Sequence, residues 1–417
     1  MSPISSYLSP EARMEHSSEK EAKTEMAETV FSKYYEYLPY NRLHKESVHS
    51  VLSFREKGAK NQCFFTRSIC AAKLGSCVQP LVYPITNVNQ TTKEVDKRLR
   101  PRQFEYHPSD AGLMAVGTLD GEVIVLNHET GNVVSCVSQY GQINGVLGLC
   151  WLKQHPSKLL VGSDNGSLRL YDISNTQPKV EENVKCNSTV IFDDFELLTS
   201  VHVNSTDDLC LTSGYSKKIA IYDICSGQRL HLFTDMHREP INVAKFANHS
   251  PNTFVTSSFD RDVKMWDLRQ KAKRPCYTAS SSRGNVMVLF SHDDLYLLVS
   301  AVDNEVKQLL AVDGRLQTDF GIVSTGSFHN YTRSYYMNGR DYIISGSCEE
   351  PIIRVCCAQT GRRLTDISLK DTAQGSSILV QSLRSDPFRV NLLSSSRSDH
   401  EGYKGGLNIC PSYGKGG

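Results

Sequence analysis

The chain has 417 residues, with 46 Lys and Arg against 45 Asp and Glu, and 39% of its residues are hydrophobic. A chain of this length and composition buries a sizeable core, as globular proteins do. Its balanced charge excludes a global attraction to nucleic acid or membranes, and no run approaches the ~18 apolar residues of a membrane span.

The first twenty residues and the cysteines indicate the cellular compartment in which we expect the protein. Residues 1–20 are polar, so we expect no signal peptide and an intracellular protein of the nucleus, the cytoplasm or both. The thirteen cysteines are scattered, with no CxxC pair and no Cys/His zinc spacing. We therefore expect reduced, mostly buried thiols, no metal site and no cofactor.

An N-terminal extension over residues 1–62 is predicted to hold one or two helices. Ser18 and Glu21 form a capping box, and apolar residues follow at helical spacing until Pro39. A second apolar stretch covers residues 43–54. Two interpretations remain open: the helices pack on the side of the following domain, or they dock into a groove of a partner.

One concentrated basic run precedes the main domain, and its members are Lys97, Arg98, Arg100 and Arg102. Such a run is typical of a nuclear-import signal or of a patch that contacts phosphate. An ordinary solvated linker is the alternative.

A motif then returns about every 45 residues, which is a period typical of propeller blades. Each copy has a short apolar run, a turn with Gly or Asp, and a second alternating run. The copies cover residues 113–127, 159–172, 209–223, 254–267, 296–312 and 342–356. Alternation on both sides of a tight turn predicts a hairpin with a buried face, and strand-like segments such as 103–106 and 241–246 supply an inner strand.

These repeats resemble the WD40 family over roughly residues 100–360. The resemblance implies an all-β propeller of four-stranded blades, usually seven in number. The last blade would come from residues 377–383 and 390–393, with 81–85 adding a strand, so we expect it to be imperfect. The predicted domains are the extension at 1–62, the propeller at 63–395 and a disordered tail at 396–417.

The WD40 resemblance also implies a hydrogen-bond network in the fourth repeat. Its members would be His237, Asp260, Trp266 and either Thr256 or Ser257. In other repeats the tryptophan is replaced, and those blades would rely on packing; the replacing residues are Leu126, Tyr171, Tyr222 and Val355. We interpret His237 and Asp260 as structural residues rather than catalytic ones.

Active-site motifs are not found in the sequence. It contains no GxSxG elbow, no GxxxxGK loop and no HExxH pair. We therefore expect no enzymatic activity and a rigid surface used for recognition.

The end of the fourth repeat indicates a partner. Residues 254–269 resemble the DWD box, or WDxR motif, of substrate receptors of cullin-4 RING ubiquitin ligases. In that family the arginine lies at the bottom of the propeller and contacts the damaged-DNA-binding adaptor protein. The resemblance gives a candidate adaptor-binding set, namely Asp260, Trp266, Asp267 and Arg269.

The region from Pro101 to Arg274 also resembles the smaller subunit of the UV-damaged-DNA-binding complex, where Trp-Asp-Leu-Arg-Gln closes the fourth repeat. The part of that relative that probes DNA has no counterpart here. A chance WDxR motif, with Arg269 paired to a carboxylate of a blade, is the alternative.

The sequence therefore favours a non-catalytic substrate receptor that binds the adaptor below and an unknown protein substrate on its top face. Two alternatives remain, a propeller that binds nucleic acid or chromatin and a general WD40 scaffold unrelated to ubiquitin. Nucleic acid is not favoured as a partner, and no membrane association is expected.

Overall fold

The computed structural model describes residues 101–138, 144–175, 189–270, 274–337, 339–347, 352–368, 379–385, 387, 393–398 and 406–410. Contacts divide the chain into residues 1–77 and 78–417, and every described residue belongs to the second unit. The predicted helices at 1–62, the strand at 81–85 and the basic residues Lys97, Arg98 and Arg100 lie outside the described residues. No helix within these described ranges is long and apolar enough to span a bilayer.

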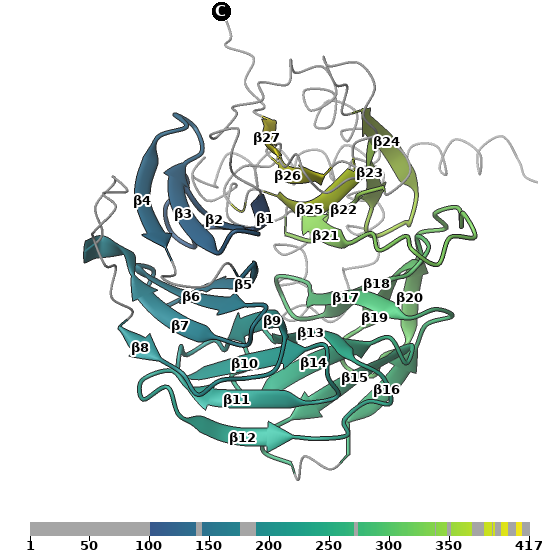
Figure 1. The fold of residues 1–417 in the computed structure, drawn as a ribbon. Coiled ribbons are helices and arrows are strands. Elements are labelled where there is room, and N and C mark those ends of the chain that lie inside the picture. The colour runs from purple at the N-terminus through teal and green to yellow at the C-terminus, as the bar shows by residue number, and fades with distance from the viewer. Residues whose placement is uncertain are drawn as a thin grey trace, which may run out of the picture. The chain divides into compact units, whose positions relative to one another are not determined.

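The predicted all-β propeller is confirmed: antiparallel sheets follow one another around a common axis (Figure 1). Six sheets have four strands and one has three. The first three sheets are β1–β4 (Pro101–Tyr106, Leu113–Thr118, Glu122–Asn127, Val133–Ser138), β5–β8 (Val146–Trp151, Lys158–Ser163, Leu168–Asp172, Val190–Ile191) and β9–β12 (Leu198–Val203, Leu209–Gly214, Ile219–Asp223, Arg229–Phe233).

The other sheets follow in chain order. They are β13–β16 (Ile241–Phe246, Thr253–Ser258, Asp262–Asp267, Tyr277–Ser280), β17–β20 (Asn285–Phe290, Tyr296–Ala301, Val306–Leu310, Leu316–Asp319), β21–β24 (Ser334–Met337, Tyr342–Ser345, Ile352–Cys357, Arg363–Ser368) and β25–β27 (Leu379–Ser385, Leu393–Ser398, Gly406–Cys410). A short 3-10 helix, η1 (Ile173–Asn175), follows β7. Strand β26 crosses the predicted end of the propeller at residue 395, and β27 lies in the segment predicted to be disordered.

Burial explains why the repeat was visible in the sequence. The second strand of a sheet, such as β14, is buried almost throughout because neighbouring sheets cover both of its faces. The outermost strands are different: β12 and β20 are mostly exposed, so their composition is less constrained. The repeat signal therefore comes from the second and third strands, which form the hairpins predicted from sequence.

Strand register corrects one prediction about the residue that replaces tryptophan. Trp266 pairs with Phe254, and Leu126, Tyr171 and Tyr222 hold the same register in their sheets. In the sixth repeat this place belongs to Cys356, which pairs with Ile343, and not to Val355. Strand β23 extends to Cys357, and a shift of one residue moves a side chain to the opposite face of the sheet.

Two aspartates join neighbouring sheets at the turns between first and second strands, and Asp207 of this pair is buried. The Asp207 carboxylate accepts hydrogen bonds from the backbone N–H groups of Lys153 (2.8 Å), Gln154 (2.6 Å) and His155 (3.1 Å) of the preceding sheet. Asp294 repeats this arrangement two sheets later, with the N–H groups of Asn248 and His249. Both aspartates have a positive φ, which turns the side chain back toward its neighbour.

The clamp at Asp207 yields a stability prediction. Because glycine tolerates the positive φ of 62° there, Asp207→Gly removes the carboxylate without backbone strain. Three backbone donors then lose a charged acceptor, and we expect the free energy of unfolding in urea to fall by about 3 kcal/mol. Asp208→Gly is the control, since its side chain is exposed and only the entropic cost of about 1 kcal/mol applies. Equal losses in the two variants would show that the clamp contributes nothing.

Candidate functional site

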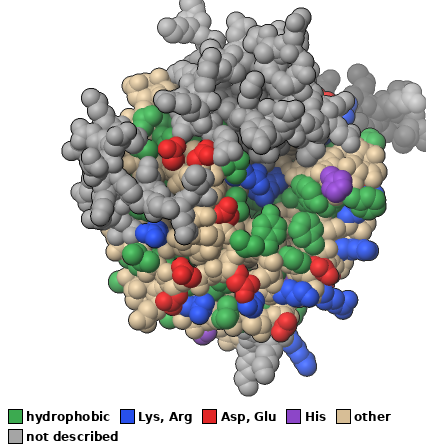
Figure 2. Space-filling view, viewed as in Figure 1, with side chains coloured by type: hydrophobic (Ala, Val, Ile, Leu, Met, Phe, Trp, Pro, Cys, Tyr) green, Lys and Arg blue, Asp and Glu red, His purple; other side chains and the backbone are tan. Residues whose placement is uncertain are grey.

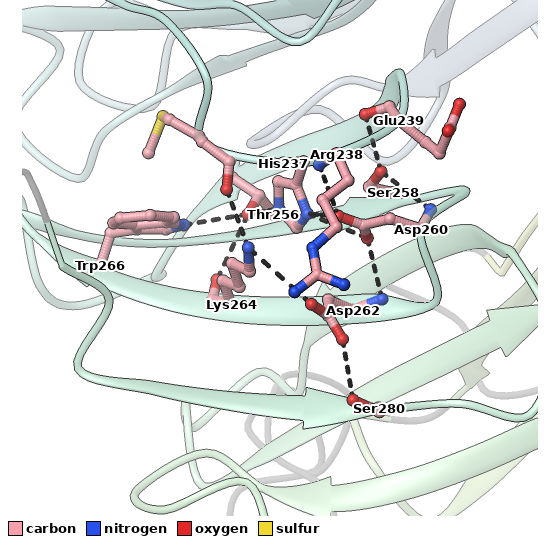
Figure 3. A network of polar contacts seen from close by, with 11 residues as sticks. His237, Arg238, Glu239, Thr256, Ser258, Asp260, Asp262, Lys264, Trp266 and Ser280 are labelled. Atoms are coloured by element: carbon pink, nitrogen blue, oxygen red, sulfur yellow. Dashed lines mark hydrogen bonds and ion pairs between the residues drawn. The ribbon is translucent and has the colours of Figure 1, made fainter.

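The fourth sheet contains a buried chain of four polar side chains (Figure 3). Trp266 Nε1 donates to Thr256 Oγ1 at 2.9 Å, and Thr256 Oγ1 lies 2.7 Å from His237 Nε2. His237 Nδ1 lies 2.9 Å from Asp260 Oδ2. The predicted network is therefore confirmed with Thr256 as its hydroxyl member, not Ser257.

The donors and acceptors of this chain are matched. Asp260 also accepts the backbone N–H groups of Arg238 and Asp262, both at 2.9 Å. Burial alone would raise the pKa of Asp260, but these N–H groups and the His237 ring outweigh it and hold the pKa below its ordinary value. Burial lowers the pKa of His237, so the neutral ring donates through Nδ1 and accepts the Thr256 hydroxyl through Nε2.

The four predicted adaptor-binding residues are not brought together. Asp260 lies in the turn before β15, whereas Asp267 ends β15 and Arg269 follows it, so the strand separates the two groups. Trp266 is only 4% exposed. Asp260 and Trp266 hold the sheet together, and Asp267 and Arg269 are the pair at the surface.

Two opposite faces of the propeller follow from this geometry. We call the end that carries Arg269 the motif face. The opposite end, where connections between successive sheets lead into the innermost strands, is the loop face. Asp260 belongs to the loop face, because the turn between second and third strands lies there.

Arg269 is held by Asp267 in a two-pronged ion pair. Its Nε lies 3.0 Å from Oδ1 and its Nη2 lies 2.6 Å from Oδ2 of that carboxylate. The Arg269 side chain is 68% exposed, while that of Asp267 is 12% exposed. The bonds from Arg269 lower the pKa of Asp267 and raise that of Arg269, so both groups are charged at neutral pH.

Comparison with the other sheets separates the two roles of Asp267. Asp172 and Asp223 end the third strands of their sheets, and each accepts a backbone N–H from the turn that follows. Asp267 does the same with the N–H of Arg269 at 3.0 Å. A turn-capping aspartate is thus a repeated feature, and among these three only Asp267 also binds a guanidinium.

The predicted basic patch is only partly described, because only Arg102 of its members falls within the described residues. Arg102 lies on the innermost strand β1 and is half-buried, so it is not part of a solvated linker. Burial, together with the nearby charge of Arg333, lowers its pKa to about 10. Sequence reasoning missed Arg333, which follows a long connection with no repeat signal of its own.

We also searched the described residues for side chains that could bind a metal ion. In the described ranges no group of three or more His, Cys, Asp or Glu side chains is placed to hold a metal ion.

Comparisons with known proteins agree with this architecture. Residues 92–319 match the β-propeller family described as nucleolar protein 10-like, N-terminal domain. The chain is 55% identical over 367 residues to "Protein DWD HYPERSENSITIVE TO UV-B 1" of Arabidopsis thaliana, which covers 86% of this chain and 47% of that protein.

Two more distant relatives match shorter parts of the chain. "DNA damage-binding protein 2" of Danio rerio is 22% identical over 249 residues, covering 58% of this chain and 48% of that protein. "DDB1- and CUL4-associated factor 7 homolog" of Dictyostelium discoideum is 25% identical over 174 residues, covering 41% of this chain and 50% of that protein. The chain thus spans about half the length of the curated relatives it matches.

The buried hydrogen-bonded chain yields a prediction that distinguishes Thr256 from Ser257 as its hydroxyl member. Thr256→Val keeps the side-chain shape but leaves Trp266 Nε1 and His237 Nε2 without their partner. We expect the free energy of unfolding to fall by about 3 kcal/mol, because each buried polar atom left unpaired costs about 1–3 kcal/mol.

The control is Ser257→Ala on the same strand. Within the described ranges the buried Ser257 hydroxyl has no hydrogen-bond partner. Its removal should change the free energy of unfolding by no more than about 0.5 kcal/mol. Urea denaturation of both variants tests this, and a larger loss for Ser257→Ala than for Thr256→Val would contradict the assignment.

Proposed function

This chain belongs to the family of β-propellers described as nucleolar protein 10-like N-terminal domains, and on that premise we propose that it is a substrate receptor of a cullin-4 RING ubiquitin ligase. Arg269 on the motif face would contact the adaptor protein of that ligase. A protein substrate would bind on the loop face. The printed names of the relatives, which refer to DWD proteins and to a DDB1- and CUL4-associated factor, support this proposal.

The observation that carries the proposal is the geometry of Arg269. Its guanidinium is exposed while Asp267 fixes its direction, so little side-chain entropy remains to be lost on binding. An arginine presented in this way is typical of the few residues that dominate an interface. The buried chain behind it makes the supporting strand rigid.

The proposed adaptor contact includes fewer residues than the four predicted from the sequence. Asp267 and Arg269 would meet the adaptor, whereas Asp260 and Trp266 would act through the position of β15. On the next sheet, Leu310 of β19 occupies the position that corresponds to Asp267 of β15. Val312, two residues later, therefore corresponds in position to Arg269. Val312 is 81% exposed and would add apolar area beside the arginine.

We also propose that the three-stranded sheet is a seventh, incomplete blade. Two contacts of β25 support this: Arg384 Nη2 lies 2.7 Å from Glu105 Oε1 on β1, and Ser385 Oγ donates to the carbonyl of Tyr336 on β21. Strand β25 therefore contacts both the first and the sixth sheets. A receptor of this kind would act without catalysis of its own, in the nucleus or the cytoplasm.

The adaptor contact is tested by binding of the purified adaptor to the full chain. Arg269→Ala should weaken that binding by at least about tenfold, because truncation of a central interface arginine commonly costs more than 1.4 kcal/mol. Arg363→Ala is the matched control, since Arg363 is also exposed and paired, with Asp366, and lies at the start of β24, two sheets away from Arg269.

Wild-type affinity in Arg269→Ala would contradict the role of the arginine. Absence of binding by the wild-type chain would contradict the receptor function itself. Thermal unfolding of each variant confirms that the fold is intact, which is expected because the side chains of Arg269 and Arg363 are both exposed.

A further inference from the structure

A long connection on the loop face, residues 320–333 between β20 and β21, is fixed by one buried carboxylate. Asp303 accepts hydrogen bonds from the backbone N–H groups of Thr325 (2.7 Å) and Gly326 (3.0 Å) and from the hydroxyls of Ser324 and Thr325. Arg283 adds an ion pair at 3.2 Å. Burial would raise the pKa of Asp303, but these bonds hold it well below its usual range.

Asn304 fixes the other half of the 320–333 connection. Its Oδ1 accepts from Asn330 and Thr332, and its Nδ2 donates to the carbonyl of Val323. Asp303 and Asn304 both have a φ of 65°, an uncommon backbone conformation maintained in consecutive residues. The connection is therefore held in place along its length by two residues of one turn.

This rigid connection presents apolar side chains to solvent. Val323 is 77% exposed, Phe328 is 74% exposed and Tyr331 is 47% exposed. Arg283 lies over the Phe328 ring at 5.1 Å, and Tyr331 packs edge-on against Phe259 at 6.1 Å. Exposed apolar groups held by a polar scaffold are typical of a recognition surface. Figure 2 shows one face of the molecule, on which hydrophobic side chains gather near the middle beside basic ones.

Two arginines lie at the loop-face ends of innermost strands, a place that we call the channel mouth. Arg333 directly precedes β21 and lines the channel pocket, and Arg102 is the second residue of β1. The pocket between the innermost strands also contains Thr199 and Gln103. Arg102 and Arg333 are close enough for each charge to act on the other, and Tyr215 adds an exposed ring nearby.

These two like charges face no counter-ion among the side chains that the structure describes. Among the described residues, no carboxylate forms an ion pair with Arg102 or Arg333, whereas the deeper Arg384 is paired with Glu105. Half-buried cations without a partner attract an anion strongly, because the surrounding protein screens them less than water does. The channel mouth is therefore suited to a carboxylate.

We propose that the channel mouth and the 320–333 connection together bind an extended acidic peptide segment, whose carboxylate meets Arg102 and Arg333 and whose neighbouring apolar side chains pack on Phe328 and Tyr331. This inference deepens the proposed function and rests on it, since the peptide would belong to the protein substrate. Tyr331 and Arg333 are two residues apart, so one short segment reaches both.

The same face is poorly suited to a nucleic acid. Other connections of the loop face carry the exposed cations Lys217, Arg238 and Arg261, but these are interspersed with exposed carboxylates, namely Asp193, Asp194, Glu196 and Glu239. A phosphate backbone crossing this face would meet them, whereas a short peptide at the channel mouth would not. The charge pattern therefore favours the peptide.

The test uses fluorescein-labelled peptide pools of about twelve residues, which span about 40 Å when extended. One pool has Asp and Glu around two Phe or Leu residues; in a second pool Lys replaces the acids, and in a third Ala replaces the apolar residues. The full chain should bind the first pool at least about tenfold more tightly than either control pool. Peptides with free and amidated C-termini distinguish a terminal carboxylate from a side-chain one.

Variants connect the binding to the proposed residues. Arg333→Glu and Phe328→Ala should each weaken binding of the first pool by at least about tenfold. Arg315→Glu makes the same charge change on the motif face and should leave binding of the first pool unchanged. Phe328 is largely exposed, so Phe328→Ala retains the fold even if Arg333→Glu does not.

Three outcomes would overturn the inference: equal binding of the acidic and basic pools, wild-type affinity in Phe328→Ala, or duplex DNA that displaces the peptides and depends on Arg333. Arg269→Ala separates this inference from the proposed function, because it should retain peptide binding while it loses the adaptor. A chain that binds the peptides but no adaptor would contradict the receptor function alone.

Discussion

The hydrogen-bonded chain from Trp266 through Thr256 and His237 to Asp260 crosses the fourth sheet inside the protein, with every donor matched by an acceptor. It ties β14 and β15 to the connection that enters the sheet on the loop face. Because β15 has only six residues, contacts that fix one end also restrict the other, where Asp267 holds Arg269 toward solvent. The arrangement on the motif face therefore depends on polar contacts made within the sheet.

Much of this fold could be predicted from the sequence, because the hairpins of the second and third strands are buried on both faces and repeat the same pattern. The buried chain was predicted as well, apart from the choice between Thr256 and Ser257, which depends on which side chain faces the histidine. The residue that replaces tryptophan in the sixth repeat was predicted as Val355 but is Cys356, one residue later. The error arose because the register depends on where the strand ends, and the apolar run in the sequence shows no clear end.

The candidate sites were predicted less completely. The sixteen residues up to Arg269 indicated a partner, yet linear order concealed that Asp260 and Arg269 lie at opposite ends of a strand. The 320–333 connection carries no repeat signal, and its rigidity comes from Asp303 and Asn304 of the preceding turn. More than two hundred residues separate Arg102 from Arg333 in sequence, and the circular arrangement of the sheets brings their charges close together.

The two faces thus differ in kind. The motif face presents Arg269, oriented by Asp267, with the exposed Val312 nearby, and the loop face presents Arg102 and Arg333, which pair with no described carboxylate, near exposed aromatic side chains. The division between these faces is tested most directly by hydrogen–deuterium exchange of the full chain with and without the purified adaptor of cullin-4 RING ligases. The account predicts that the adaptor protects backbone amides on the motif face, at residues 268–270 and in the turn after β19, and leaves 320–333 unchanged. Protection of residues 320–333 without protection at Arg269 would contradict it.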